Sequence, residues 1–335
     1  MTAPAREALP RRRLLALPLA GLTAAAAAAE PVPVRLGTLQ FGTVQWLAEV
    51  IRRHRLDRSG GFTLQTTLLA DTAAGRVAIM AGSADIVAAD WPFVAVQRAA
   101  GTALCFAPFS NTLGGVMVRA DAPIRTLADL AGHRLGVAGG PVDKSWLMVQ
   151  AAGRAGTPAT DLAAAARVVY GAPPLLSAKL QQGELDAVLT FWTFAARLQA
   201  HGFREAVTVG DCARRLGLPA TLGLVGFVFH EDWARAHPAA ISGYLRAAAE
   251  AQRLLATQAA EWQAIRPLMN ADDDALFGEL ARRFVGGITA TTAAAEQQTA
   301  EQVFDILLRT GGTRATGGIS RLPEGIFWPL PTAAD

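Results

Sequence analysis

The chain has 335 residues, of which 51% are hydrophobic and only 18% are charged. This composition excludes a disordered, charge-rich protein and supplies the apolar side chains for a large core, in about two domains by length. Two cysteines, Cys105 and Cys212, exclude a disulfide-rich scaffold and a four-cysteine metal site.

The first 29 residues have the pattern of a secretory signal peptide. Arg6 and the three arginines 11–13 precede an apolar run, residues 14–29, that is shorter than the roughly 20 residues of a membrane-spanning helix. We expect cleavage near Ala29–Glu30 and export to the periplasm, by the general secretory route or by the twin-arginine route. Without this segment, basic and acidic residues are equal in number, which indicates no nucleic-acid partner.

The rest of the chain repeats itself weakly at a spacing near 100 residues. Residues 79–93 align with residues 180–194, with a glycine, an aspartate, a tryptophan and a phenylalanine coinciding at a constant offset of 101. Upstream, Arg-Leu-Gly and Trp-Leu sequences also recur, at 35–37 and 134–136 and at 46–47 and 146–147. We therefore predict two lobes of similar topology.

Each copy is expected to run strand, helix, helix, strand. The expected first copy has a strand at 34–39, a helix at 44–54, a helix ending at Gly82 and a strand at 86–89. The expected second copy has the same elements at 134–137, 144–155, Gly183 and 187–189. This order is typical of parallel sheets covered by helices, whose ligands bind beyond the carboxyl ends of the strands.

The remaining elements join and complete the two copies. Strands are expected at 103–108, 115–119 and 224–229, an Ala-rich helical run from His237-Pro238 to about Arg266, and a last helix at 291–309. The predicted fold is α/β with two lobes, each a mostly parallel sheet with helices on both faces. Lobe I comprises residues 30–116 and 226–335, lobe II residues 117–225, and hinge strands lie near 116–119 and 224–228.

Four segments carry a resemblance to a known family: residues 80–85, 118–137, 180–186 and 231–238. In order and spacing they resemble the periplasmic solute-binding proteins of ABC importers, in the nitrate/sulfonate/taurine-type branch that also includes binders of thiamine-pyrimidine precursors. The resemblance covers residues 32–310. It implies a type II binding-protein fold whose cleft closes on a small-molecule ligand, and an ABC permease in the inner membrane as partner. We expect a monomer.

The loops that follow the strands are expected to converge on this cleft. Helix starts near Thr43 and Ser145 offer N–H groups to a carboxylate, sulfonate or phosphate, and a glycine such as Gly140 lets the backbone approach a ligand. The candidate ligand-binding residues are Gln40, Phe41, Thr43, Asp90, Trp91, Asn111, Gly140, Asp143, Lys144, Ser145, Thr190, Phe191 and Trp192.

Several of these candidates have a structural alternative. Trp91 and Trp192, in predicted loops, either stack on a flat ring from two sides or cap the lobe cores. Asp90 and Asp143 either pair with an amine, amidine or aminopyrimidine or cap a turn and a helix. Lys144, one of only two lysines, is either a ligand contact or a solvated residue at a helix start. Trp46 and Trp146 lie inside predicted helices and are interpreted as core residues.

Other chemistry has little support in the sequence. No histidine stands at metal-ligand spacing, and there is neither a P-loop nor a nucleophile motif, so we expect no metal, no cofactor and no catalytic residue. Asp85 and Asp186, at helix–strand turns, are expected to be structural, with their carboxylates accepting from nearby backbone N–H groups. The two cysteines fall in different lobes and are expected to be free, buried thiols rather than a bridge.

The predicted function is capture of a small organic or anionic solute for an ABC importer. Two alternatives stay open: an enzyme of cofactor-precursor metabolism on the same fold, and an exported sensory or binding protein without a transporter. The ligand also stays open among a sulfonate, a nitrate-like anion, a carboxylate and an aminopyrimidine-like molecule.

Overall fold

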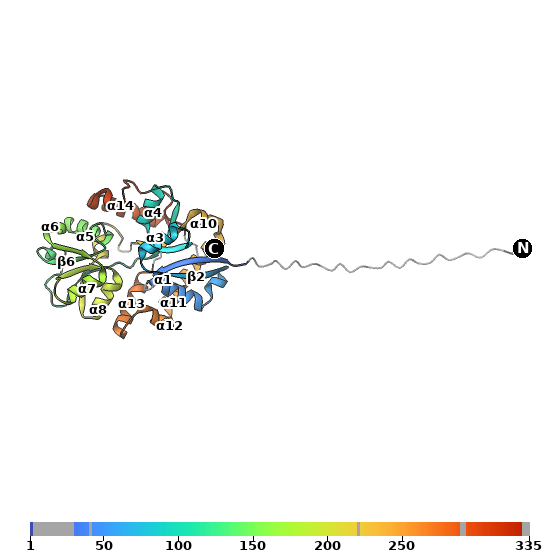
Figure 1. The fold of residues 1–335 in the computed structure, drawn as a ribbon, viewed down its shortest axis with the longest axis horizontal. Helices are drawn as coiled ribbons and strands as arrows, with labels where there is room; N and C mark the ends of the chain where they lie inside the picture. The colour runs from blue at the N-terminus through green and yellow to red at the C-terminus, as the bar shows by residue number, and fades with distance from the viewer. Residues whose placement is uncertain (3–29, 40–41, 220–221, 289–292, 330–335) are drawn as a thin grey trace. The chain divides into compact units, whose positions relative to one another are not determined.

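The computed structural model describes residues 1–2, 30–39, 42–219, 222–288 and 293–329 (Figure 1). The predicted signal peptide therefore lies outside the described residues, apart from residues 1–2. Among the helices that are described, none is both long and apolar enough to span a bilayer.

The first sheet has five strands in the order β2-β1-β3-β10-β4. Their bounds are β1 Val32–Leu39, β2 Phe62–Leu69, β3 Ile86–Asp90, β4 Leu104–Ser110 and β10 Val225–His230. Strand β1 is parallel to β2 and β3, whereas β10 is antiparallel to β3 and β4. The helices around this sheet are α1 Thr43–Arg53, α2 Leu56–Ser59, α3 Thr72–Met80 and α4 Trp91–Ala99.

The second sheet repeats this topology in the order β7-β6-β8-β5-β9. Its strands are β5 Gly115–Arg119, β6 Arg134–Ala138, β7 Arg167–Gly171, β8 Ala187–Thr190 and β9 Phe203–Thr208. Strand β6 is parallel to β7 and β8, and β5 is antiparallel to β8 and β9. Its helices are α5 Lys144–Arg154, α6 Leu162–Ala165, α7 Pro173–Gln181, α8 Trp192–Ala200 and α9 Val209–Arg215, with a 3-10 turn at Ala128–Leu130. The predicted α/β fold with two lobes is confirmed.

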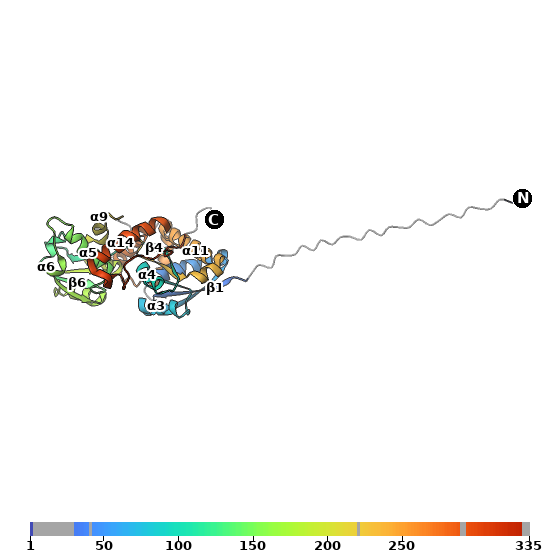
Figure 2. The same cartoon turned by 90° about the horizontal axis from the view of Figure 1, so that it is seen from above.

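Five helices complete the chain: α10 Glu231–Ala236, α11 Pro238–Thr257, α12 Ala259–Met269, α13 Asp274–Gly286 and α14 Ala293–Ala315. The single run predicted from residue 238 to 266 is wrong, because Gln258 adopts extended backbone angles that separate α11 from α12. We call β1–β4 and β10 with α1–α4 and α10–α13 the first half, and β5–β9 with α5–α9 the second half. Helix α14 packs against α5 of the second half (Figure 2).

The repeat appears in the structure as two equivalent ion pairs. Asp85 accepts from the backbone N–H of Arg35 at 2.8 Å and from its guanidinium at 2.5 Å. Asp186 accepts from the backbone N–H of Arg134 at 2.8 Å and from its guanidinium at 2.6 Å. The structural role predicted for both aspartates is confirmed, with an arginine side chain added to the expected backbone donor.

The core runs through both halves. One apolar cluster contains Trp91 and Val94 of the first half, Trp146 of the second and Phe304 of α14. Trp46 and Trp146 are 2% and 1% exposed, as expected of core residues. Cys105 and Cys212 are free, buried thiols. Burial raises the pKa of these thiols to about 11 and about 12, which leaves them unreactive.

Candidate functional site

Four helices begin where central strands of the two sheets end. Helix α4 follows β3 directly, and α1, α5 and α8 follow β1, β6 and β8 after short connections. In parallel sheets this edge collects the polar side chains that touch a ligand. At this edge an ion pair joins the two halves, between Asp90 at the end of β3 and Lys144 at the start of α5.

Asp90 is the centre of that contact. Its Oδ1 accepts from the Phe93 N–H at 2.9 Å and so caps α4, while its Oδ2 accepts from Lys144 Nζ at 2.6 Å and from Arg76 Nη2 at 3.2 Å. Burial acts to raise the pKa of Asp90, but the Lys144 ammonium and the Arg76 guanidinium outweigh it, so the pKa lies below its ordinary value. The Asp90 carboxylate is therefore held charged.

Lys144 is also shielded by a second carboxylate, that of Asp143. Burial acts to lower the pKa of Lys144, yet Asp90 and then Asp143 keep it above the ordinary value. Asp143 caps α5 by accepting from the Trp146 N–H at 3.1 Å, and burial raises its pKa against the opposing effect of Lys144. The α4 and α5 starts thus share an aspartate–lysine–aspartate cluster, whose two carboxylates are balanced in formal charge only when Arg76 is counted with Lys144.

The starts of α1 and α8 differ from those of α4 and α5. Their N-cap residues, Gly42 and Phe191, make no side-chain hydrogen bond to the helix, and neither first turn carries an acidic residue. Their N–H groups and the positive end of the helix dipole are left without a carboxylate. The two helices lie close together, because the Trp46 and Trp192 rings meet edge to face with centroids 6.3 Å apart.

Two polar side chains near the joined edges have atoms without a partner among the described residues. Thr190, the last residue of β8, is 2% exposed and its Oγ1 makes no hydrogen bond. Asn111 lies in the crossing from β4 to β5, and its buried Oδ1 is also without a partner. Unpaired buried polar atoms are uncommon, which makes these two informative about bound molecules.

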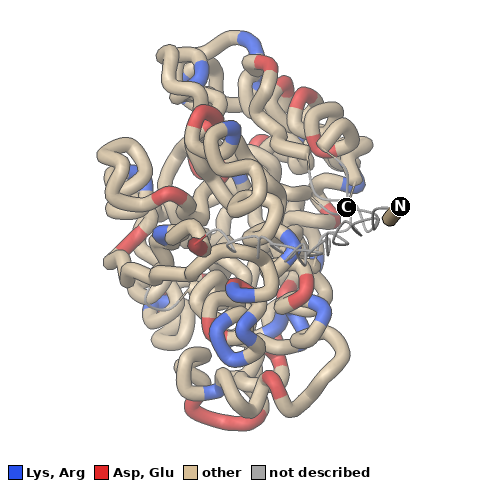
Figure 3. The backbone as a smooth tube through the Cα atoms, turned by 90° about the vertical axis from the view of Figure 1, so that its right-hand side faces the viewer, with Lys and Arg blue, Asp and Glu red and all other residues tan. Residues whose placement is uncertain are grey.

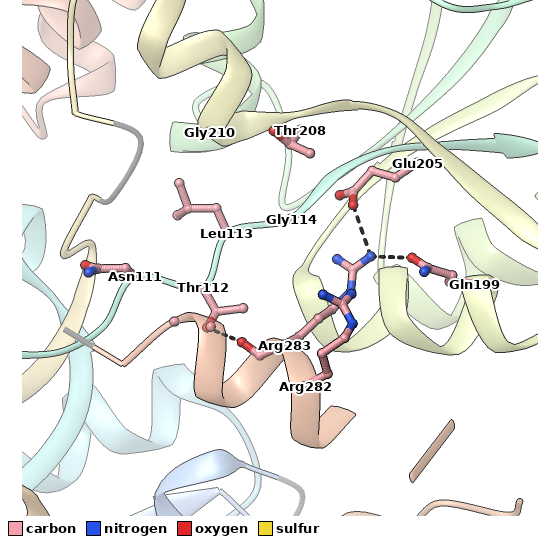
Figure 4. A pocket seen from close by; sticks show the side chains of 12 residues that line it. Asn111, Thr112, Leu113, Gly114, Gln199, Glu205, Thr208, Gly210, Arg282 and Arg283 are labelled. Carbon is pink, nitrogen blue, oxygen red and sulfur yellow. Dashed lines mark hydrogen bonds and ion pairs between the residues drawn. The ribbon is translucent and has the colours of Figure 1, made fainter. Parts of the chain in front are cut away.

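Asn111 also lines the pocket shown in Figure 4, which has a volume of about 410 Å³. This pocket lies beside residues 111–114, where the chain crosses from the first sheet to the second, and is lined as well by Glu205 and Arg283. Strand β5 belongs to the second sheet and β10 to the first, so each crossing comes just before one of the predicted hinge strands.

The predicted binding residues are partly brought together. Asp90, Asp143 and Lys144 form one cluster, Ser145 follows in the first turn of α5, and Gly140 precedes it with φ of 107°. Thr43 opens α1, and Phe191 is 41% exposed at the start of α8. Gln40 and Phe41 lie outside the described residues. Both aspartates do cap helices, which was the structural alternative for Asp143.

The prediction that Trp91 and Trp192 lie in loops is wrong, because each is the first residue of a helix. For Trp91 the structure agrees with the alternative of a core residue. Because β3 passes directly into α4, the Trp91 indole packs into the core and is 2% exposed. Trp192 is half-buried against Trp46 instead. In this structure only Trp192 of the two has surface to offer a ligand.

Sequence reasoning missed Arg76 and the open start of α8. Arg76, on α3, reaches Asp90 and stacks its guanidinium over the Phe93 ring at 4.9 Å from the centroid. Its position fourteen residues before Asp90 gave no signal, because only the fold brings them together. The α8 start had a signal: Phe191 occupies the place that Asp90 has in the first copy. In the view of Figure 3, basic and acidic residues are intermixed along the backbone.

Comparison with family models settles the family. The sequence matches the family described as NMT1/THI5 like over residues 61–261, more than half of the chain. The chain belongs to the NMT1/THI5-like family. A search of curated proteins gave no match.

Solved structures with this fold include importer proteins. The periplasmic aliphatic sulphonate binding protein SsuA from Escherichia coli matches with a TM-score of 0.66 at 18% identity, covering 86% of this chain and 99% of that one. The alkanesulfonate-binding protein SsuA from Xanthomonas axonopodis pv. citri, bound to MOPS, matches with a TM-score of 0.60 at 17% identity, covering 89% and 97%. The chain therefore has the fold of ABC-importer solute-binding proteins.

An enzyme shares this fold. The desulfurization enzyme DSZB matches with a TM-score of 0.54 at 17% identity, covering 84% of this chain and 92% of that one. The fold alone is thus compatible with binding and with catalysis.

Proposed function

We propose that this protein is the extracytoplasmic solute-binding component of an ABC-type importer. In this proposal lobe I is the first half together with α14 and the residues that follow it, lobe II is the second half, and the crossings before β5 and β10 are the hinge. Closure on a solute creates the form that docks on an inner-membrane permease. The protein acts as a monomer in the periplasm, after export by the general secretory or the twin-arginine route.

One observation carries this proposal: the Asp90–Lys144 contact at the carboxyl ends of the strands. It joins residues of the two halves at 2.6 Å, at the edge where such sheets bind ligands. A solute bound there would touch both halves and would favour their approach. Such a ligand stabilises the closed form only by the difference in its affinity for the two forms.

The charges around that contact also orient the solute. The α4 and α5 starts are already occupied by Asp90 and Asp143, whereas the α1 and α8 starts are open. We place an anionic group of the solute, a sulfonate or a carboxylate, at the open starts, with the Thr190 hydroxyl as a further donor. A flat or apolar part would lie against Phe191 and Trp192. Thr43, Asn111, Gly140 and Ser145 complete the proposed contacts.

In this proposal the Lys144 ammonium is a direct contact of the solute. It has three donors, and among the described residues the only side-chain acceptor for it is Asp90 Oδ2. A bound acceptor would use a donor that Asp90 leaves free. A bare anion such as nitrate is less favoured than a larger solute, because Asp90 and Asp143 lie beside Lys144 and would repel it.

The similarity to DSZB supports an enzyme as the second candidate. The two cysteines of this chain are poor candidates for a nucleophile, because both thiols are buried with raised pKa and therefore hold little thiolate. Turnover of a bound compound would be the observation in its favour. No metal or cofactor is part of the proposed site.

Mass spectrometry of compounds released from the purified, denatured protein would identify the solute. A thermal-shift screen of MOPS, short alkanesulfonates, nitrate, carboxylates and aminopyrimidines would test the classes in parallel. We expect one compound with an anionic end to raise the melting temperature and to remain chemically unchanged. Stabilisation by none of these compounds and no released molecule, or conversion of the bound compound, would contradict the proposal.

A further inference from the structure

Arg283 of α13 reaches from the first half to the second. Its Nη2 donates to Gln199 Oε1 of α8 at 2.6 Å and to Glu205 Oε2 of β9 at 3.0 Å (Figure 4). Its Nε donates to Glu279 Oε1 of its own helix at 2.6 Å. The side chain is only 9% exposed, so this contact is much better shielded from water than a surface ion pair. We call the contact of Arg283 with Gln199 and Glu205 the Arg283 latch.

The same helix end also holds the crossing between the sheets. The Thr112 hydroxyl donates to the carbonyl oxygen of Arg283 at 3.3 Å, and the Asn111 N–H donates to the carbonyl oxygen of Gly287 at 2.7 Å. A Cβ at Gly287 would lie 1.7 Å from Thr112 Oγ1, so only glycine permits this approach. The end of α13 that carries Arg283 is therefore bonded to the crossing from β4 to β5, about which the halves would move.

The partners of the latch depend on one another for charge compensation. Burial raises the pKa of Glu205 above its ordinary value, and the Arg283 guanidinium acts in the opposite direction. A Cβ at Gly115 would lie 2.1 Å from Glu205 Oε1, which shows how closely the carboxylate packs on β5. Separating the halves at this point would break the hydrogen bonds of Arg283 with Gln199 and Glu205, while Arg283 would keep its pair with Glu279. Glu205 would then lose the guanidinium that opposes the effect of burial on its pKa, which is unfavourable as long as the carboxylate stays buried.

We propose that the Arg283 latch stabilises the closed arrangement of the two halves, in which Lys144 contacts Asp90, before any solute is bound. Arg283 is then a positioning residue: it touches no solute but sets how often the solute site is assembled. Apparent solute affinity scales with the population of the competent arrangement, so the latch tunes affinity from outside the site. The inference concerns the ligand-free protein and does not depend on which solute is bound.

The test measures the distance between the halves by pulsed electron paramagnetic resonance. Spin labels are placed at V77C on α3 and L175C on α7, where the native side chains are 68% and 54% exposed. The native thiols are buried with raised pKa and should resist labelling. The labelled protein is compared with the same protein carrying R283M, E205Q, both changes, R283K or R282M, all without added solute.

We expect R283M and E205Q each to lower the ratio of the closed to the more separated arrangement by about tenfold, and the double variant to lower it no further than R283M. R283K keeps the charge and should recover part of the closed population. R282M removes a neighbouring arginine that pairs with Glu279 within the same helix, and should leave the distances unchanged.

Wild-type distances in R283M and E205Q, with an unchanged circular dichroism spectrum, would overturn the proposal. An equal shift in R282M would also overturn it, because the effect would then follow any loss of charge from α13. If R283M does not fold, E205Q and R283K decide the outcome on the same criteria.

Discussion

The two halves share their internal framework and differ at the edge where they meet. Both have the same strand order, and both anchor the turn before an inner strand, β3 or β8, with an arginine–aspartate pair. At the edge, Asp90 caps α4 in the first half and Asp143 caps α5 in the second half. These two helices do not occupy equivalent places in the repeat. A duplicated chain has thus kept the positions that fold each lobe and changed the positions that a solute would touch.

The largest expected change in stability comes from breaking the ion pairs that both halves share. Asp85 is 6% exposed and Asp186 is 30% exposed. D85A should lower the free energy of unfolding by about 2–3 kcal/mol, because the buried Asp85 carboxylate accepts from both the N–H and the guanidinium of Arg35, and D186A by about 1 kcal/mol. Urea denaturation of both variants measures the difference. Equal losses would mean that burial does not separate the two pairs.

A second comparison concerns the loop before α5. Gly139 has φ of 89°, and a Cβ there would lie 2.7 Å from Asp143 Oδ2. G139A should therefore lower the free energy of unfolding by about 2 kcal/mol. G278A in α13, where a Cβ would meet nothing within 4 Å, is the matched control and should be neutral or slightly stabilising. A harmless G139A would show that the loop can adopt another backbone path.

Restoring the repeat at residue 191 separates stability from binding. F191D places a carboxylate at the α8 start, where the first half has Asp90, and should stabilise the protein by about 1 kcal/mol. It should also weaken binding of an anionic solute by at least about tenfold, because the carboxylate occupies the open helix start. Thermal melting and calorimetric titration measure the two effects. Unchanged affinity would show that the anionic group of the solute does not bind at the α8 start.

The smallest expected effect is the pH dependence of stability that comes from the two helix caps, Asp90 of α4 and Asp143 of α5. The pKa of Asp90 lies below its ordinary value, so its contribution to stability is present above that value and is lost as the pH falls through the lowered pKa. The pKa of Asp143 is raised, so its contribution is lost as the pH rises through the raised pKa. Differences in unfolding free energy from D90N and D143N, measured between pH 3 and pH 7, should therefore change in opposite directions. Parallel curves would contradict the distinction.

The sequence predicted the repeated framework well because its elements and turns are marked by short local patterns that occur twice. The Arg-Leu-Gly segments form strands β1 and β6, the Gly-x-x-Asp segments form the turns just before β3 and β8, and Gly82 and Gly183 take the positive φ expected of them. Asp90, Asp143 and Lys144 could be selected because they follow strands. The family resemblance in four short segments pointed to the same fold.

Contacts between segments that are distant in the chain could not be predicted from the sequence. Trp91 and Trp192 are equivalent in the repeat, yet one is in the core and the other lies against Trp46, a choice made by packing between the halves. The reach of Arg76 to Asp90 depends on where α3 packs beside β3. Arg283 is one arginine among many in the sequence, and only the tertiary fold places it against Glu205.

A solute site at the joined strand ends is tested most directly by calorimetric titration of the identified solute into the wild-type protein, K144M and K179M. These are the only two lysines, and Lys179 pairs with Glu184 on the second half alone. We predict one bound solute per chain, binding at least about tenfold weaker in K144M, and wild-type binding in K179M. Wild-type affinity in K144M, or an equal loss in both variants, would contradict a solute site at the joined strand ends.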